Sequence, residues 1–192
     1  MNKKEVRKAF LQKRQSLTEA EWLVLCGSIY NTFFASVDLS FVKNLHIYLP
    51  MEAAREVDTW QIIDKIRREH PQVRLIIPKI DNGHLSHFYF EGLHQVKTNT
   101  WGIPEPTQGV PAEPSKIDMV IAPMLAADKQ GNRVGYGKGF YDRFLKECGP
   151  ACRKIGLSLF PLVDKIDVDE YDVPLDAVIL PSGYQEFKRS RQ

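Results

Sequence analysis

The spacing of apolar residues predicts two helices at the start of the chain. Four apolar residues recur at helical spacing among cations: Val6, Phe10, Leu11 and Leu17. After a short break, four more continue the helical spacing: Trp22, Leu25, Ile29 and Phe33. Thr18 and Glu21 stand between the two sets at the separation of a capping box, so we expect a second helix to begin there.

Farther along, short apolar runs alternate with helical patterns. The runs that predict strands are residues 44–50, 72–78, 84–90, 116–123, 154–160 and 175–181. Helical patterns cover residues 58–70, with Asp58 or Thr59 as the cap, and residues 140–148. This alternation predicts an α/β fold with an open, mainly parallel, Rossmann-like sheet and helices on both faces. We expect residues 1–192 to form a single domain.

Residues 97–115 interrupt the alternation, because they are rich in proline, glycine and threonine. Such a stretch could link two domains. Too few residues lie on either side to form separate cores, so we expect a long ordered loop at the mouth of a site.

Composition narrows the class of protein. Hydrophobic residues make up 43% of the chain and charged residues 26%, and the net charge is only +2, so no broad field for nucleic acid is expected. We find no apolar run as long as a membrane span, which needs roughly 20 residues, and no secretory signal pattern. The three cysteines lack paired spacing, which is typical of a reducing compartment. We therefore expect a cytoplasmic monomer without a nucleic-acid or membrane partner.

The stretch "NRVGYGKGFYDRFL", residues 132–145, carries the strongest chemical signal. Three glycines alternate with other residues in it: Gly135, Gly137 and Gly139. The loop joins a predicted strand to a predicted helix, where outward amides and the helix dipole favour an anion. A tight turn without a ligand is the alternative, but Arg133 and Lys138 beside the glycines favour phosphate binding. The spacing matches neither a dinucleotide fingerprint nor a P-loop.

Three other segments are expected beside this loop. They are residues 49–59 after the first strand, the "WGIPEP" stretch at 101–106, and the acidic run at 163–176. In an open α/β sheet, ligands bind beyond the carboxyl ends of the strands. Glycine amides, cations, a flat aromatic ring and carboxylates suit magnesium–nucleotide chemistry on a planar, anionic substrate.

The chain resembles the 5-formyltetrahydrofolate cyclo-ligase family, also called methenyltetrahydrofolate synthetase. The resemblance rests on an N-terminal K-x-x-x-R, on "YLP" followed by an acidic residue, on "WGIPEP", on "GNRVGYGKGFYDRFL" and on a late D-x-x-x-D. These motifs span nearly the whole chain in order. The resemblance implies an enzyme that uses ATP and Mg²⁺ to convert 5-formyltetrahydrofolate into 5,10-methenyltetrahydrofolate, ADP and phosphate.

The resemblance also implies roles for individual residues. ATP would be bound by Lys3, Lys4, Arg7, Arg133, Val134, Gly135, Tyr136, Gly137, Lys138, Gly139, Phe140 and Tyr141. The folate would be bound by Leu49, Glu56, Trp101, Tyr136 and Phe140, and catalysis would fall to Lys138, Arg133 and Tyr136. Magnesium would be bound by Asp142 and by Asp169, with the neighbouring Asp172 as the alternative second ligand.

Several of these residues have a plainer interpretation. Asp142 would be favourable in the first turn of a helix through the dipole alone, Trp101 could be a core residue, and Glu56 could be a surface carboxylate. The cations between Lys3 and Arg14 could be a solvated helix face. Two other functions also stay open: a non-catalytic nucleotide- or RNA-binding module that uses the basic first helix and the tail at 188–192, and a different ATP-dependent ligase or kinase.

Overall fold

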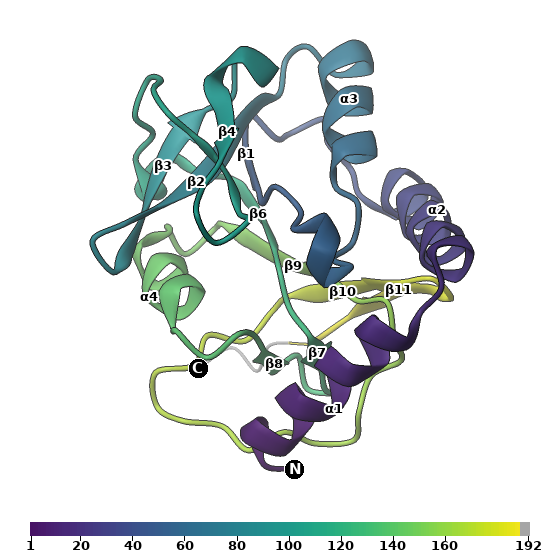
Figure 1. Ribbon diagram of the computed structural model, residues 1–192. Helices are drawn as coiled ribbons and strands as arrows, with labels where there is room; N and C mark the ends of the chain where they lie inside the picture. Colours follow the sequence, from purple (N-terminus) through teal and green to yellow (C-terminus); the bar gives the residue numbers. More distant parts are fainter. Residues whose placement is uncertain (189–192) are drawn as a thin grey trace.

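A seven-stranded sheet forms the centre of the protein (Figure 1). The computed structural model describes residues 1–188 of the chain. The strands of the sheet are β1 (Asn44–Ile47), β2 (Arg74–Asp81), β3 (His84–Tyr89), β6 (Met119–Ala122), β9 (Arg153–Leu157), β10 (Ala177–Leu180) and β11 (Gly183–Glu186). Their order is β11-β10-β9-β6-β1-β2-β3. The inner five are parallel, and β3 and β11 pair antiparallel at the two edges. This confirms the predicted open, mainly parallel α/β sheet.

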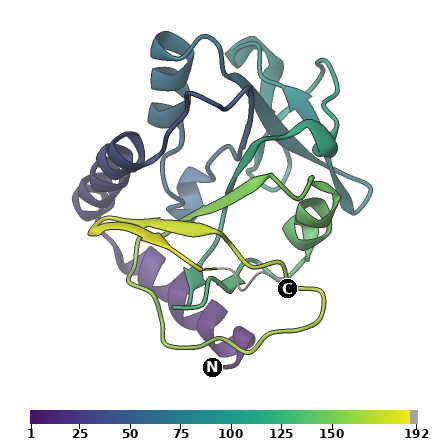
Figure 2. The same cartoon turned by 180° about the vertical axis from the view of Figure 1, so that it is seen from behind.

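Helices cover both faces of the sheet, as Figures 1 and 2 show from opposite sides. They are α1 (Lys3–Ser16), α2 (Glu19–Ser36), α3 (Trp60–Glu69) and α4 (Phe140–Glu147), with short 3₁₀ turns η1 (Glu52–Ala54), η2 (Leu93–Gln95) and η3 (Pro114–Lys116). The capping box is confirmed, since the Thr18 hydroxyl accepts from the Glu21 amide and the Glu21 carboxylate accepts from the Thr18 amide. At α3, the Asp58 carboxylate accepts from the Trp60 amide.

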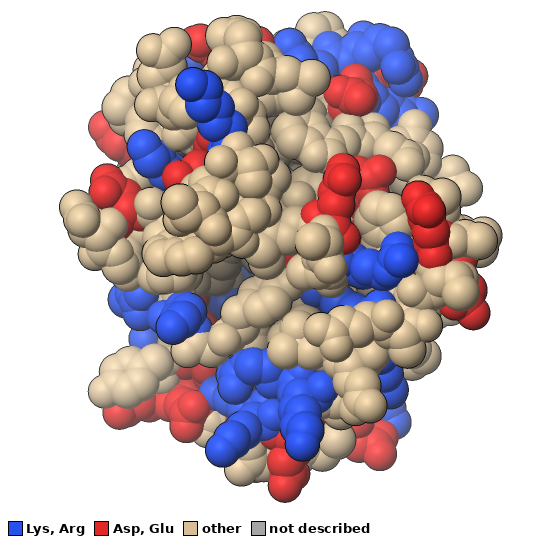
Figure 3. All heavy atoms as spheres, viewed as in Figure 1, with Lys and Arg blue, Asp and Glu red and all other residues tan. Residues whose placement is uncertain are grey.

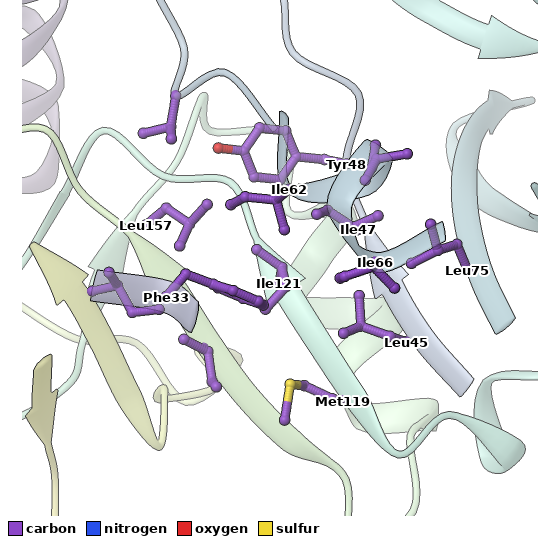
Figure 4. Close-up of a cluster of buried hydrophobic side chains, with 14 of the residues drawn as sticks. Phe33, Leu45, Ile47, Tyr48, Ile62, Ile66, Leu75, Met119, Ile121 and Leu157 are labelled. Carbon is purple, nitrogen blue, oxygen red and sulfur yellow. The ribbon is translucent and has the colours of Figure 1, made fainter. Parts of the chain in front are cut away.

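Alternate residues of the buried strands face opposite helices. Met119 and Ile121 of β6 point into a cluster with α2 and α3, which Figure 4 shows around Phe33 and Ile66. The intervening Val120 faces a second cluster below α4. Burial on both faces explains why these strands read as continuous apolar runs.

Two short antiparallel ribbons lie outside the main sheet. The first joins β4 (Val96–Thr98) to β5 (Pro104–Pro106), so the long ordered loop expected over residues 97–115 contains a short hairpin, and its turn lines the cavity described below. Asn99 shapes its turn, because its side-chain oxygen accepts from the Trp101 and Ile103 amides. Prolines read as turn signals in sequence, yet they are compatible with such edge strands. The second ribbon joins β7 (Ala126–Ala127) to β8 (Arg133–Val134), immediately before the glycine loop.

The first helix packs across the second ribbon. Val6 and Phe10 of α1 form a third apolar cluster with Ala126, Val134 and Ile166. This packing brings the amino-terminal turn of α1 beside the glycine loop and the acidic run. In the part of the chain that is described, no helix combines the length and the apolar character that a membrane crossing would require. The basic tail beyond residue 188 lies outside the described residues.

A pair of histidines is buried below α4. The His46 Nε2 atom of β1 lies 3.1 Å from the His87 Nδ1 atom of β3, and both rings pack against Phe144. Burial lowers the pKa of both imidazoles, and that of His87 falls from 6.5 to about 4. Both rings are therefore neutral near neutral pH.

Candidate active site

A cavity of about 1520 Å³ lies at the carboxyl edge of the parallel strands. Its walls come from α1, the segment after β1, the β2–β3 and β4–β5 ribbons, the glycine loop and the acidic run. Figure 3 shows cations gathered over α1 at the bottom of the view. A volume above the usual range of roughly 300–1,000 Å³ for one small ligand leaves room for two.

The first wall combines the glycine loop with α1. The Arg7 Nε atom donates to the Gly135 carbonyl at 2.9 Å. Gly137 has a φ of +89°, and a Cβ placed there would lie 3.0 Å from the Arg7 Cζ atom. Lys3, Arg7 and Lys138 all line the cavity at this wall. The first helix is therefore not only a solvated face, because its amino-terminal cations lie beside the predicted phosphate loop.

The acidic residues of this wall are already bonded to cations. The Asp142 carboxylate accepts from the Arg133 guanidinium at 2.7 Å and from the Val173 amide at 3.1 Å. Lys3 donates to Asp169 at 2.6 Å and also to Asp172. Burial acts to lower the pKa of the Lys3 ammonium, but the bonds and charges of these two carboxylates together raise it.

These carboxylates suit a metal that is shared with a bound phosphate. Within residues 1–188 there is no cluster of three or more His, Cys, Asp or Glu residues that could hold a metal alone. Mg²⁺ commonly binds through one or two carboxylates and completes its shell with substrate phosphates and water. Asp142 and Asp169, which line the same cavity as the glycine loop, fit that mode.

The opposite wall holds the predicted folate residues. Glu56 is only 4% exposed, so it is not a surface carboxylate. Its Oε1 accepts from the Tyr136 hydroxyl at 2.8 Å and its Oε2 from the Met51 amide at 2.7 Å. Burial raises the pKa of the Glu56 carboxyl group, against the opposing effects of the Met51 amide and Arg14. Trp101 is 72% exposed at the β4–β5 turn and lines the cavity, so it is not a core residue.

Most of the predicted site residues come together in this cavity. Those that line it are Lys3, Arg7, Leu49, Glu56, Trp101, Arg133, Val134, Gly135, Tyr136, Gly137, Lys138, Gly139, Phe140, Tyr141, Asp142 and Asp169. Asp172 lines it as well. Lys4 is exposed and is not among the described lining residues, so we leave it out of the site.

Sequence reasoning missed the environment of Arg14. This residue is only 2% exposed, and its guanidinium donates to the Tyr136 hydroxyl at 3.1 Å and to the Met124 carbonyl. The helical period contains a signal that could have revealed it. Arg14 follows Val6 and Phe10 at steps of four, which places it on the buried face of α1.

The fold and the cavity define the class of protein: an open α/β domain in which a glycine loop, cations and carboxylates line one large cavity. The chain belongs to the 5-formyltetrahydrofolate cyclo-ligase family, whose model matches residues 1–181.

Relatives match the chain over most of its length. The 5-formyltetrahydrofolate cyclo-ligase of Escherichia coli K12 is 32% identical over 181 residues, which cover 92% of this chain and 98% of that protein. The Mycoplasma pneumoniae enzyme of the same name is 29% identical and covers 93% of this chain and 98% of its own. The solved 5,10-methenyltetrahydrofolate synthetase of Aquifex aeolicus has a TM-score of 0.84 at 27% identity, covering 99% of this chain and 95% of that one.

Proposed function

We propose that this protein converts 5-formyltetrahydrofolate to 5,10-methenyltetrahydrofolate, with ATP as the second substrate and Mg²⁺ as the cofactor. Family membership over residues 1–181 supports the folate reaction. The single observation that carries the ATP assignment is the position of Arg7, whose guanidinium lies against Gly135 and Gly137 of the glycine loop. The cations Lys3, Arg7 and Lys138 line the same cavity as the glycine loop and the first residue of α4, a combination that favours a phosphate.

The chemical difficulty of the reaction explains the need for ATP. The oxygen of a formamide is a weak nucleophile and a poor leaving group. It would attack the γ-phosphorus of ATP, with ADP leaving. The folate N10 would then attack the formyl carbon and lose its proton, and the formyl oxygen would leave as phosphate.

The residues of the first wall would stabilise charge during phosphoryl transfer. Lys138, Arg7 and the glycine-loop amides would bind the phosphate oxygens, which is most of what a protein contributes to this chemistry. Arg133 would act mainly by holding Asp142, to which it donates at 2.7 Å. Bound Mg²⁺ would supply further neutralisation of phosphate charge, with Asp142 and Asp169 as its protein ligands.

The second wall would bind the folate. Leu49 and Trp101 of this wall, together with Phe140 next to the glycine loop, offer apolar surface to a planar ring system. Glu56 offers a buried acceptor for ring N–H groups. Tyr136 joins the two walls, because it belongs to the glycine loop and its hydroxyl donates to Glu56. Its ring would lie close to the reacting formyl group.

The decisive assay is absorbance of the methenyl product with purified protein and 5-formyltetrahydrofolate. We expect product only when ATP and Mg²⁺ are both supplied, with one ADP formed per product. Product without ATP would refute the ATP assignment. ATP binding without folate turnover would favour the non-catalytic nucleotide-binding module, and turnover of another substrate would favour a different ligase or kinase.

We further propose that the enzyme acts as a cytoplasmic monomer without a nucleic-acid or membrane partner. The three free cysteines, Cys26, Cys148 and Cys152, fit a reducing compartment. Sedimentation of the purified protein would test the monomer.

A further inference from the structure

Glu56 is linked to a buried cation by a chain of hydrogen bonds. The Tyr136 hydroxyl donates to Glu56 Oε1 at 2.8 Å, and the Arg14 Nη1 donates to the same hydroxyl at 3.1 Å. Tyr136 and Glu56 line the cavity, whereas Arg14 lies behind the wall and is nearly inaccessible. Arg14 therefore acts on the cavity only through the phenol and through its charge.

The placement of Glu56 is fixed from several directions. Its Oε2 is held by the Met51 amide at 2.7 Å, and its backbone carbonyl accepts from the Trp22 indole at 2.8 Å. The preceding Arg55 has a φ of +47°, a left-handed conformation that costs free energy for a residue other than glycine. Such constraint indicates that the direction of the Glu56 carboxylate matters to the site.

The burial of Arg14 is costly for the fold. Its Nε atom has no hydrogen-bond partner among the described residues, and a buried donor without a partner loses its hydration without compensation. An apolar side chain on the same face of α1 would avoid that cost and continue the cluster of Val6 and Phe10. The guanidinium is therefore better explained by its effect on the site than by packing.

We propose that Arg14 is a positioning residue for the folate subsite. Through the Tyr136 hydroxyl, its guanidinium keeps the Glu56 carboxylate ionised and aimed into the cavity, where it accepts N–H donors from the pterin ring. This inference rests on the proposed function for the identity of the ligand, but not for the linkage itself. This role requires an acceptor-only carboxylate, because a protonated Glu56 would present a donor to those N–H groups.

The titratable and charged groups around Glu56 are consistent with an ionised carboxylate at this position. Tyr48 at the end of β1 and Tyr141 of α4 are buried phenols whose pKa values are raised by burial and by the Glu56 charge, so they stay neutral. Tyr136 behaves in the same way for the same reasons. Arg14 is the cation that opposes the effect of burial on the pKa of Glu56. The bonds from the Met51 amide and the Tyr136 hydroxyl act in the same direction as Arg14, so removing the guanidinium should raise the pKa of Glu56 further.

The linkage can be measured without any ligand. The carboxyl carbon of Glu56 would be followed by ¹³C NMR through a pH titration, with Glu56→Gln to assign the signal. We expect Arg14→Met to move the midpoint upward by about one pH unit, and Tyr136→Phe to move it in the same direction by less. Arg14→Lys should restore part of the shift, and Lys8→Gln on the exposed face of α1 should change nothing.

Binding of 5-formyltetrahydrofolate without ATP is then measured over the same pH range. The acid limb should follow the Glu56 midpoint, so that Arg14→Met binds about tenfold more weakly on that limb and is close to wild type at high pH. A variant that combines Arg14→Met with Tyr136→Phe should lose less binding free energy than the sum of the losses in the two single variants.

Each outcome decides the matter. An unchanged Glu56 midpoint in Tyr136→Phe and Arg14→Met would overturn the linkage, as would a loss of binding that is equal at every pH, which marks a purely structural role. Tyr136→Phe keeps the test open if Arg14→Met fails to fold, because Tyr136 lies on an exposed loop. A shifted midpoint without folate binding would leave the linkage intact and overturn the pterin assignment together with the proposed function.

Discussion

The buried histidine pair makes the stability of the fold depend on pH. His87 has a pKa of about 4 in the folded protein, below its ordinary value of 6.5, because burial disfavours the charged ring. The unfolded chain therefore takes up the proton first. The stabilisation is fully present above pH 6.5 and is lost as the pH falls from 6.5 toward about 4. Between about pH 7 and pH 5, linkage to His87 alone lowers the free energy of unfolding by roughly 2 kcal/mol.

The test compares urea unfolding of the wild type and of His87→Gln at both pH values. Glutamine keeps an amide that can bond to His46 but cannot titrate, so the variant should be less stable near neutral pH yet lose about 2 kcal/mol less on acidification. His94→Gln, on the exposed η2 turn, is the matched control and should behave like the wild type. Equal losses in wild type and His87→Gln would show that His87 is not held neutral, and would refute the reasoning.

Three further predictions concern the first wall of the cavity. Asp142→Asn should remove most activity and raise the Mg²⁺ requirement in steady-state kinetics, with a loss of stability of about 1–3 kcal/mol because buried Arg133 loses its charged partner; wild-type kinetics would return Asp142 to a helix-dipole role. Arg7→Ala and Lys138→Ala should each raise the KM for ATP and combine less than additively, while exposed Lys13→Ala stays near neutral; an Arg7→Ala variant as mild as Lys13→Ala would contradict shared phosphate binding. Gly137→Ala should cost about 1–2 kcal/mol in thermal unfolding and weaken ATP use, because its φ of +89° disfavours a Cβ that would also press on Arg7; unchanged ATP kinetics would show that this contact is dispensable.

Local patterns were enough to predict six of the seven strands of the sheet and the four α-helices. Strand β6 is buried on both faces and so reads as a plain apolar run, and the Thr18–Glu21 capping box lies within four consecutive residues. Strand β11 was missed because residues 183–186 form an edge strand with polar, partly exposed side chains and no periodic apolar signal. Its partner β10, which is buried, was predicted.

The site could be predicted only in part. The three alternating glycines predict an anion site from local sequence alone, and that site stays a prediction. The bond from Arg7 to the Gly135 carbonyl joins positions 128 apart, and the bond from Arg14 to Tyr136 joins positions 122 apart. No local pattern specifies such contacts. The first was expected only from the family resemblance, and the second was not expected at all. Both depend on how α1 packs on the β7–β8 ribbon.

The contact between Arg7 and Gly137 also constrains how the family can vary. The guanidinium lies where a side chain at position 137 would begin, so the two positions cannot change independently. Among relatives, a residue other than glycine at position 137 should occur together with a side chain shorter than arginine at position 7. It should also be asparagine or aspartate, since these tolerate a positive φ better than other residues. Positions 7 and 137 would then show paired substitutions, although most of the sequence lies between them.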